Sequence, residues 1–190
     1  IVTGGIKEVL PREMTINGKE LAKNKVVTTS PDTEGSVTLV GCGVSAADQQ
    51  VIIVNPETLK RCQPDEIGEI WVSGASVAQG YWNRKTQTAA LFHASVADET
   101  PGRFLRTGDL GFLQEGELFV TGRLKNLIII RGRNYYPHDI ELTVEKSHPA
   151  LRKACGAAFS VDVDGEEQLV IVYEVKRSYI RKLDTEAVTR

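Results

Sequence analysis

Short apolar segments rich in β-branched residues, separated by turn residues, recur along the first two thirds of the chain. They occupy residues 37–40, 50–54 and 67–72, and this pattern predicts β-strands. Short strands at roughly ten-residue spacing are typical of a small barrel or sandwich. Residues 84–92 have helical character instead. We therefore expect a small distorted β-barrel with a short helix between two of its strands.

A predicted β-hairpin follows. Residues 115–117 (Glu-Gly-Glu) form a turn signal between the apolar runs 111–113 and 118–120. Asp109 lies directly before this hairpin, so we expect the strands to hold its carboxylate in place. The strand pattern breaks at residues 121–126 (Thr-Gly-Arg-Leu-Lys-Asn). We place a domain boundary there, with a first domain at residues 1–124.

The remaining residues, 125–190, predict a small α+β unit. The apolar run 127–130 predicts a buried strand, and a helix is expected to begin at Pro137, because proline is favoured at the first helical position. Residues 153–161 and 168–175 predict an antiparallel strand pair. The expected fold class is therefore α+β, a β-barrel subdomain followed by a truncated α+β C-terminal domain.

Residues 1–35 carry many charges and turn residues, and by themselves they predict a surface loop. Trp71 and Tyr81 are expected in the barrel core. The chain has no initiator Met, and its last residues read as the first turn of a helix that stops early. We therefore expect a segment of a longer protein.

The composition of the chain argues against several classes of protein. With 41% hydrophobic and 25% charged residues the chain is ordinary globular material. A net charge of −2, with few aromatic residues among the basic ones, argues against nucleic-acid binding. No signal peptide or membrane-spanning run is visible. The three cysteines form no CxxC pair, so we expect reduced, mostly buried thiols in a cytoplasmic protein without a metal site.

Two side chains suggest binding chemistry. Asp109, in the sequence Thr-Gly-Asp-Leu, has a carboxylate that can accept two hydrogen bonds at once, as the vicinal hydroxyls of a ribose require. Arg123, directly after a glycine, offers a rigid fork of donors to phosphate or sugar oxygens. Each signal is weak alone, because a Thr-Gly-Asp tripeptide is usually only a turn.

The ordered set of motifs is more specific. Four stretches carry it: 68–74 (GEIWVSG), 77–82 (VAQGYW), 102–106 (GRFLR) and 122–141 (GRLKNLIIIRGRNYYPHDIE). Together they resemble the adenylate-forming superfamily, which includes acyl-CoA synthetases, peptide-synthetase adenylation domains and luciferases, and most of all its fatty-acyl-AMP ligases. The resemblance covers about residues 35–175. Asn126, Tyr135 and His138 depart from the pattern, which usually has Asp, His and Gln there.

The resemblance implies a reaction and roles for residues. A fatty acid would attack ATP, usually with Mg²⁺, to form acyl-AMP, and the acyl group would pass to a holo acyl carrier protein in lipid or polyketide biosynthesis. Asp109 would hold the ribose hydroxyls and Arg123 the ribose or phosphate. Lys125 would be the hinge of the C-terminal domain, although an ordinary exposed loop lysine remains an alternative. The face presented after rotation would include the predicted turn Gly132, Arg133 and Asn134.

The same resemblance assigns residues 1–124 to the β-barrel part of the large N-terminal domain and residues 125–190 to the start of the mobile C-terminal domain. It also places a family-specific insertion at about residues 11–35, which disfavours the rearrangement that admits CoA. The pyrophosphate loop, the adenine-stacking motif and the C-terminal lysine of the family are missing, so we expect this piece alone to be inactive. Two other readings stay open, a long-chain acyl-CoA ligase and a non-catalytic interaction module.

Overall fold

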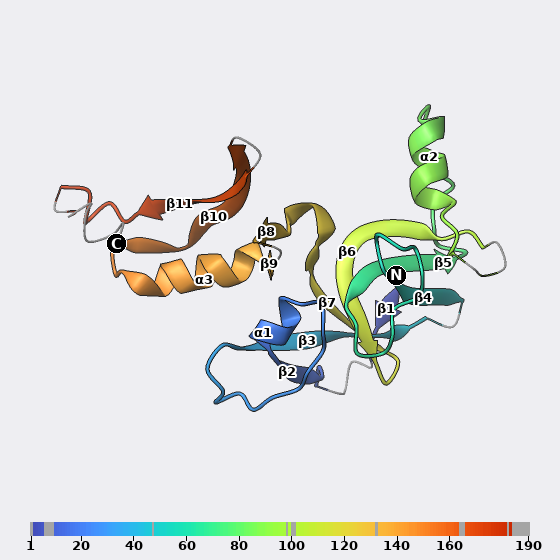
Figure 1. Ribbon diagram of the computed structural model, residues 1–190, viewed down its shortest axis with the longest axis horizontal. Coiled ribbons are helices and arrows are strands. Elements are labelled where there is room, and N and C mark those ends of the chain that lie inside the picture. Colours follow the sequence, from blue (N-terminus) through green and yellow to red (C-terminus); the bar gives the residue numbers. More distant parts are fainter. Residues whose placement is uncertain are drawn as a thin grey trace. The chain divides into compact units, whose positions relative to one another are not determined.

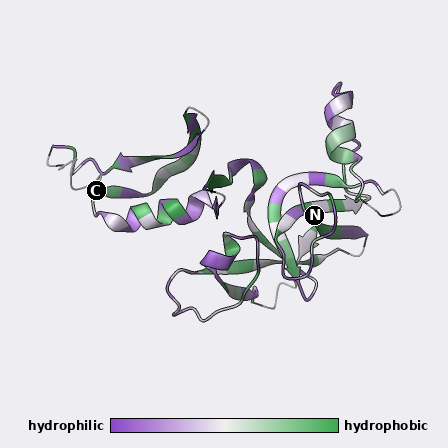
Figure 2. Cartoon of the chain, viewed as in Figure 1, coloured by the Kyte–Doolittle hydropathy of each residue, from purple (hydrophilic) through white to green (hydrophobic). Residues whose placement is uncertain are grey.

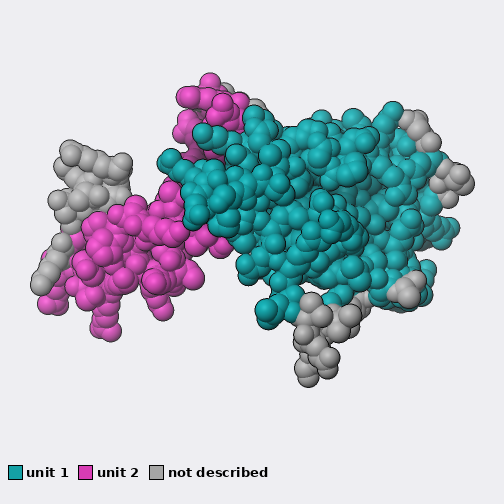
Figure 3. Space-filling model, turned by 90° about the horizontal axis from the view of Figure 1, so that it is seen from below, with its two compact units in different colours: residues 1–125 teal, residues 126–190 magenta. Residues whose placement is uncertain are grey.

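The computed structural model describes residues 2–5, 10–46, 48–97, 99, 102–131, 133–163, 166–181 and 183. Contacts within the chain divide it into two compact units, Ile1–Lys125 and Asn126–Arg190 (Figure 3). Both contain strands and helices, which confirms the α+β class. No helix in the described part of the chain is long and apolar enough to cross a membrane.

The first unit is built on one curled, antiparallel half-barrel sheet (Figure 1). Its main strand order is β1-β3-β7-β6-β5-β4, and β2 pairs with β3 beside this path. Every strand predicted in this region is present, although most are longer than expected. The bounds are β1 Thr3–Gly4, β2 Glu13–Asn17, β3 Ser36–Ser45, β4 Gln49–Val54, β5 Gly68–Gly74, β6 Leu105–Gln114 and β7 Glu117–Arg123.

The predicted hairpin is formed by β6 and β7. Its turn consists of Glu115 and Gly116, whose φ angles of 52° and 83° are both positive. Such two-residue turns match the right-handed twist of the flanking strands. Phe112 and Phe119 pair across the hairpin with their ring centroids 5.2 Å apart and are almost fully buried. This aromatic pair anchors the hairpin that leads to Asp109 and Arg123.

The core lies on both faces of strands β4 and β5. One cluster consists of Val51, Ile53, Ile70, Val72 and Leu118, and the other of Ile52, Val54, Trp71, Val96 and Phe104. Trp71 is fully buried, as predicted. The same prediction for Tyr81 is wrong, because its side chain is 53% exposed and contacts Phe92 edge-on at the end of helix α2 (Lys85–Phe92).

The N-terminal residues are more ordered than a surface loop. Residues 13–17 form β2, and Asn17 caps the short helix α1 (Gly18–Leu21) by accepting hydrogen bonds from two backbone amides. Met14, Ile16 and Leu21 are buried. The surface-loop interpretation is therefore wrong for this stretch, because alternate apolar residues of β2 face the core.

The second unit follows a single turn of 3-10 helix, Leu124–Asn126. It contains β8 Ile128–Ile130, β9 Arg133–Tyr135, α3 Pro137–Ser147, β10 Leu151–Val163 and β11 Glu166–Val175. The helix begins at Pro137, as predicted. It packs on β10, where the Glu141 side chain accepts a hydrogen bond from the Ala158 amide. The backbone carbonyl of Glu141 accepts from the Tyr173 hydroxyl of β11, so Glu141 joins the helix to both strands.

Two predictions for the second unit need correction. Ile128 of β8 is buried, but Ile129 is 47% exposed, so the apolar run is only partly a buried strand. Arg133 and Asn134 lie in β9, paired with β8, and not in a turn. Gly132 lies outside the described residues.

Exposed apolar positions are not confined to β8. Figure 2 shows apolar residues along the β10–β11 hairpin, where Phe159, Ile171 and Val172 are exposed. Cys42, Cys62 and Cys155 are free thiols, but Cys42 is exposed and the other two are half-buried. The expectation of mostly buried cysteines was therefore wrong for Cys42.

Candidate functional site

The Thr-Gly-Asp sequence forms a bulge inside strand β6. Strand β6 has three residues, Thr107, Gly108 and Asp109, opposite the single residue Ile70 of β5. The register of the β5–β6 pairing shifts at this point. Gly108 has a φ of +73° and open space around the position of a Cβ. Only glycine adopts this backbone without strain. What the sequence predicts as a turn is therefore a bulge anchored at both ends by strand pairing.

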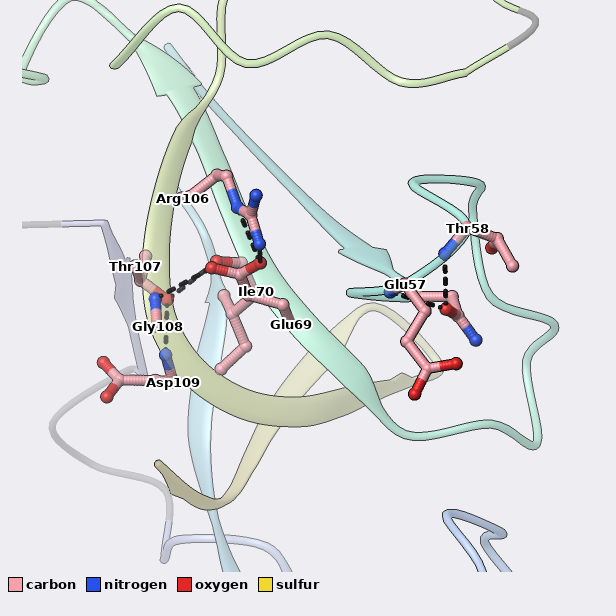
Figure 4. A network of polar contacts seen from close by, with 9 residues as sticks. Glu57, Thr58, Glu69, Ile70, Arg106, Thr107, Gly108 and Asp109 are labelled. Atoms are coloured by element: carbon pink, nitrogen blue, oxygen red, sulfur yellow. Dashed lines mark hydrogen bonds and ion pairs between the residues drawn. The ribbon is translucent and has the colours of Figure 1, made fainter. Parts of the chain in front are cut away.

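A buried carboxylate holds this bulge (Figure 4). Glu69 of β5 is 2% exposed, and its Oε1 accepts a hydrogen bond from the Gly108 amide at 3.1 Å. Its Oε2 accepts from Arg106 Nε at 2.9 Å and pairs with Arg106 Nη2 at 2.8 Å. The guanidinium of Arg106 also lies over the Trp71 ring, 5.5 Å from its centre. Two hydrogen bonds and the ion pair with Arg106 therefore compensate the desolvated charge of Glu69.

Thr107 fixes the next peptide. Its hydroxyl donates to the Ile70 carbonyl at 2.7 Å and accepts from the Asp109 amide at 3.0 Å. The backbone of Asp109 is thus tied to β5 through Thr107, and Figure 4 shows its carboxylate pointing away from Glu69. This arrangement presents the Asp109 side chain on a backbone that cannot turn freely.

Asp109 and Arg123 are brought together by the hairpin. They are partners in the β6–β7 register, and Arg123 Nε donates to Asp109 Oδ1 at 2.6 Å. The two side chains are 33% and 53% exposed. Ion pairs at such exposed positions contribute only about 0.2–1 kcal/mol. A polar ligand can therefore replace Arg123 at the carboxylate at little cost.

The other predicted site residues lie elsewhere in the fold. Lys125 is exposed in the 3-10 turn, two residues after the end of β7. Arg133 and Asn134 belong to the second unit, in β9. The structure thus unites Asp109 and Arg123 within one sheet, and the assigned roles of these residues and of Lys125 stay predictions.

Sequence reasoning missed the residues that support the site, Glu69, Arg106 and Thr107. One signal was available, a glutamate inside the apolar strand at residues 67–72, because a buried carboxylate requires partners. The identity of those partners depends on strand pairing.

Among the described residues, no group of three or more His, Cys, Asp or Glu is placed to hold a metal ion.

Comparison with known proteins finds similar chains among AMP-binding enzymes and fatty-acid ligases. Residues 23–82 match the family described as AMP-binding enzyme. The medium-chain-fatty-acid–[acyl-carrier-protein] ligase JamA of Moorena producens is 54% identical over 179 residues, which cover 93% of this chain and 30% of JamA. The chain is similar to the AMP-binding enzymes over residues 23–82. Asp109 and Arg123 lie beyond the residues that match the family model.

Two further relatives of this chain are informative. The structure of the L. pneumophila fatty acyl-adenylate ligase, in complex with acyl adenylate and pyrophosphate, is 38% identical with a TM-score of 0.63, and the match covers 100% of this chain and 33% of that one. A putative fatty-acid–CoA ligase, FadD21 of Mycobacterium tuberculosis, is 49% identical over 130 residues, 66% of this chain and 22% of the relative. The chain therefore spans a third or less of these relatives.

Proposed function

We propose that this chain is a segment of an ATP-dependent fatty-acyl-AMP ligase, which activates a fatty acid as acyl-AMP for transfer to a holo acyl carrier protein. The observation that carries the proposal is the paired Asp109 and Arg123 on the bulged hairpin of a chain that is similar to the AMP-binding enzymes. The named activity of JamA, at 54% identity, supports the choice of fatty acid and carrier protein.

In this proposal Asp109 accepts hydrogen bonds from the two ribose hydroxyls of ATP. Arg123, released from the exposed ion pair, turns its donors to the ribose or a phosphate. Mg²⁺ bound together with the ATP would supply further positive charge at the phosphates. Lys125 serves as the hinge between the two units, and Arg133 and Asn134 belong to the surface presented after rotation. The chemistry requires alignment and charge stabilisation and no covalent step by a side chain.

A second candidate is an acyl-CoA ligase, which the identity to FadD21 favours. Both enzymes form acyl-AMP, so they differ only in the thiol that accepts the acyl group. The ordered segment at residues 13–21, which pairs with β3 through β2, falls inside the proposed insertion at about residues 11–35. If the protein is a fatty-acyl-AMP ligase, this segment is part of the insertion that disfavours the use of CoA.

The test uses the complete polypeptide that carries this chain. Labelled fatty acid and ATP are incubated with CoA or with a holo carrier protein, and the products are separated. We expect acyl-AMP that persists with CoA and is consumed by the carrier. Asp109→Ala is expected to abolish adenylate formation, whereas Asp48→Ala, at an exposed position in the turn between β3 and β4, is the matched control and is expected to leave it unchanged.

Each contrary outcome points elsewhere. Rapid formation of acyl-CoA would assign the protein to the CoA ligases. Absence of any adenylate would favour the interaction-module reading. An Asp109→Ala enzyme as active as the wild type would show that the ribose is held by another residue.

A further inference from the structure

The buried pair of Glu69 and Arg106 lies behind the proposed ribose carboxylate. We propose that Glu69 is a positioning residue, which sets the affinity of the enzyme for ATP by fixing the bulge that carries Asp109. This inference rests on the proposed function, because it assumes that Asp109 binds the nucleotide. Glu69 itself is 2% exposed and reaches Asp109 only through the Gly108 peptide, so it acts without touching the substrate.

Stability alone gives a poor account of this pair. Burying a carboxylate has a large desolvation cost, and replacing a buried ion pair by apolar side chains of similar volume is often neutral or stabilising. Glu69 lies in a strand whose neighbours Ile70 and Trp71 are core residues. An apolar residue would therefore suit position 69 if packing were its only role. A conformational role explains why a charge is present there.

The contacts define that role. Glu69 accepts the Gly108 amide, and Thr107 accepts the Asp109 amide while donating to Ile70. Hydrogen bonds therefore connect the amides of Gly108 and Asp109 to strand β5, directly through Glu69 in the first case and through Thr107 in the second. Without an acceptor at position 69, the Gly108 amide loses its partner, and glycine at a positive φ offers little resistance to rotation. A shift of about 1 Å in a binding group costs up to about a hundredfold in rate.

The decisive variant removes both charges together. The double variant Glu69→Met with Arg106→Met, made in the complete polypeptide, leaves no unpaired buried charge but removes the acceptor for the Gly108 amide. We expect its Tm to stay close to that of the wild type and its KM for ATP to rise at least about tenfold, with an unchanged KM for the fatty acid. Glu69→Gln keeps the shape and one acceptor oxygen, so we expect a smaller rise in the same KM.

A second comparison tests the route through Asp109. Adenylate formation that remains in an Asp109→Asn background is measured with and without the double variant. Because Glu69 acts through Asp109, we expect no further rise in the KM for ATP in that background. Additive effects would show an independent route and overturn the proposal.

The remaining outcomes separate this inference from the proposed function. An active wild-type enzyme and a double variant with an unchanged KM for ATP would reduce Glu69 to a purely structural residue. If the double variant fails to fold, an unchanged KM for ATP in Glu69→Gln would have the same meaning. A wild-type enzyme that forms no adenylate would overturn both proposals together.

Discussion

The close packing of β6 against β7 leaves no room for a side chain at Gly111. A methyl group at Gly111 would overlap the carbonyl oxygen of Phe119 and lie 3.0 Å from Ile70 Cδ1. The carbonyl belongs to the paired strand, so relief requires β7 to move away. Overpacking of this kind costs typically about 1–3 kcal/mol, and each ladder hydrogen bond that is lost adds about 1 kcal/mol. We expect Gly111→Ala to lower the free energy of unfolding by about 3 kcal/mol or more.

Gly116→Ala is the matched control, since it makes the same chemical change in the same hairpin. Gly116 has a φ of +83° and nothing within 4 Å of the added Cβ. Its substitution therefore costs only the strain of a left-handed residue, about 1–2 kcal/mol. The two alanine variants separate steric overlap from backbone strain.

Urea unfolding followed by tryptophan fluorescence measures both variants. The chain has two tryptophans, Trp71 with no exposed surface and Trp82 with 90% exposed, and both lie in the first unit. The change in signal therefore comes mainly from Trp71 and reports on the half-barrel. We expect a lower midpoint with an unchanged slope for each variant. A Gly111→Ala chain that is as stable as Gly116→Ala would refute the packing of β6 against β7 described above.

Two further predictions concern titratable groups. Burial raises the pKa of the Cys62 thiol to about 11. At pH 8 we therefore expect the exposed Cys42 to react with a thiol reagent well before Cys62, as mass spectrometry of the partly labelled chain would show. Equal reaction rates of the two thiols would contradict the burial of Cys62. Burial also raises the pKa of Asp139 in the first turn of α3, so its ionised form costs stability above the folded pKa and costs nothing below the ordinary value. Asp139→Asn is expected to increase the protection of α3 amides from hydrogen exchange at pH 7 and to leave it unchanged at pH 3, and no gain at pH 7 would refute this.

The sequence predicted those parts of the fold that depend on local pattern. Strands β3 to β7 of the half-barrel, the hairpin around Glu115 and Gly116 and the start of α3 at Pro137 carry short-range signals, namely alternation, turn residues and a fixed φ. Strands β1 and β2 were not predicted, because charged and turn residues dominate residues 1–35. Burial was less predictable, because it depends on which elements pack together. Tyr81 and Ile129 are apolar enough for a core but lie where no described element covers them fully.

The candidate site shows the same division. Asp109 and Arg123 could be singled out from the sequence because their motifs flank a predicted hairpin, and the structure pairs them in register. The ion pair of Glu69 with Arg106 could not be predicted from the sequence. The two residues are 37 positions apart and meet only because of the shifted register of β5 and β6. The expected turn at Arg133 and Asn134 is strand β9 instead, because these two residues pair with β8, the strand directly before them in the sequence.

The buried pair has a consequence for how this family can change over evolutionary time. Losing Glu69 alone leaves Arg106, whose side chain is 26% exposed beside Trp71, without its partner. Losing Arg106 alone leaves the buried Glu69 carboxylate without its charge partner, at a cost of about 3–5 kcal/mol, which is a large part of the stability of a typical domain. A lineage can pass through that intermediate only if other substitutions have first added stability. We therefore expect related sequences either to keep both Glu69 and Arg106 or to replace both.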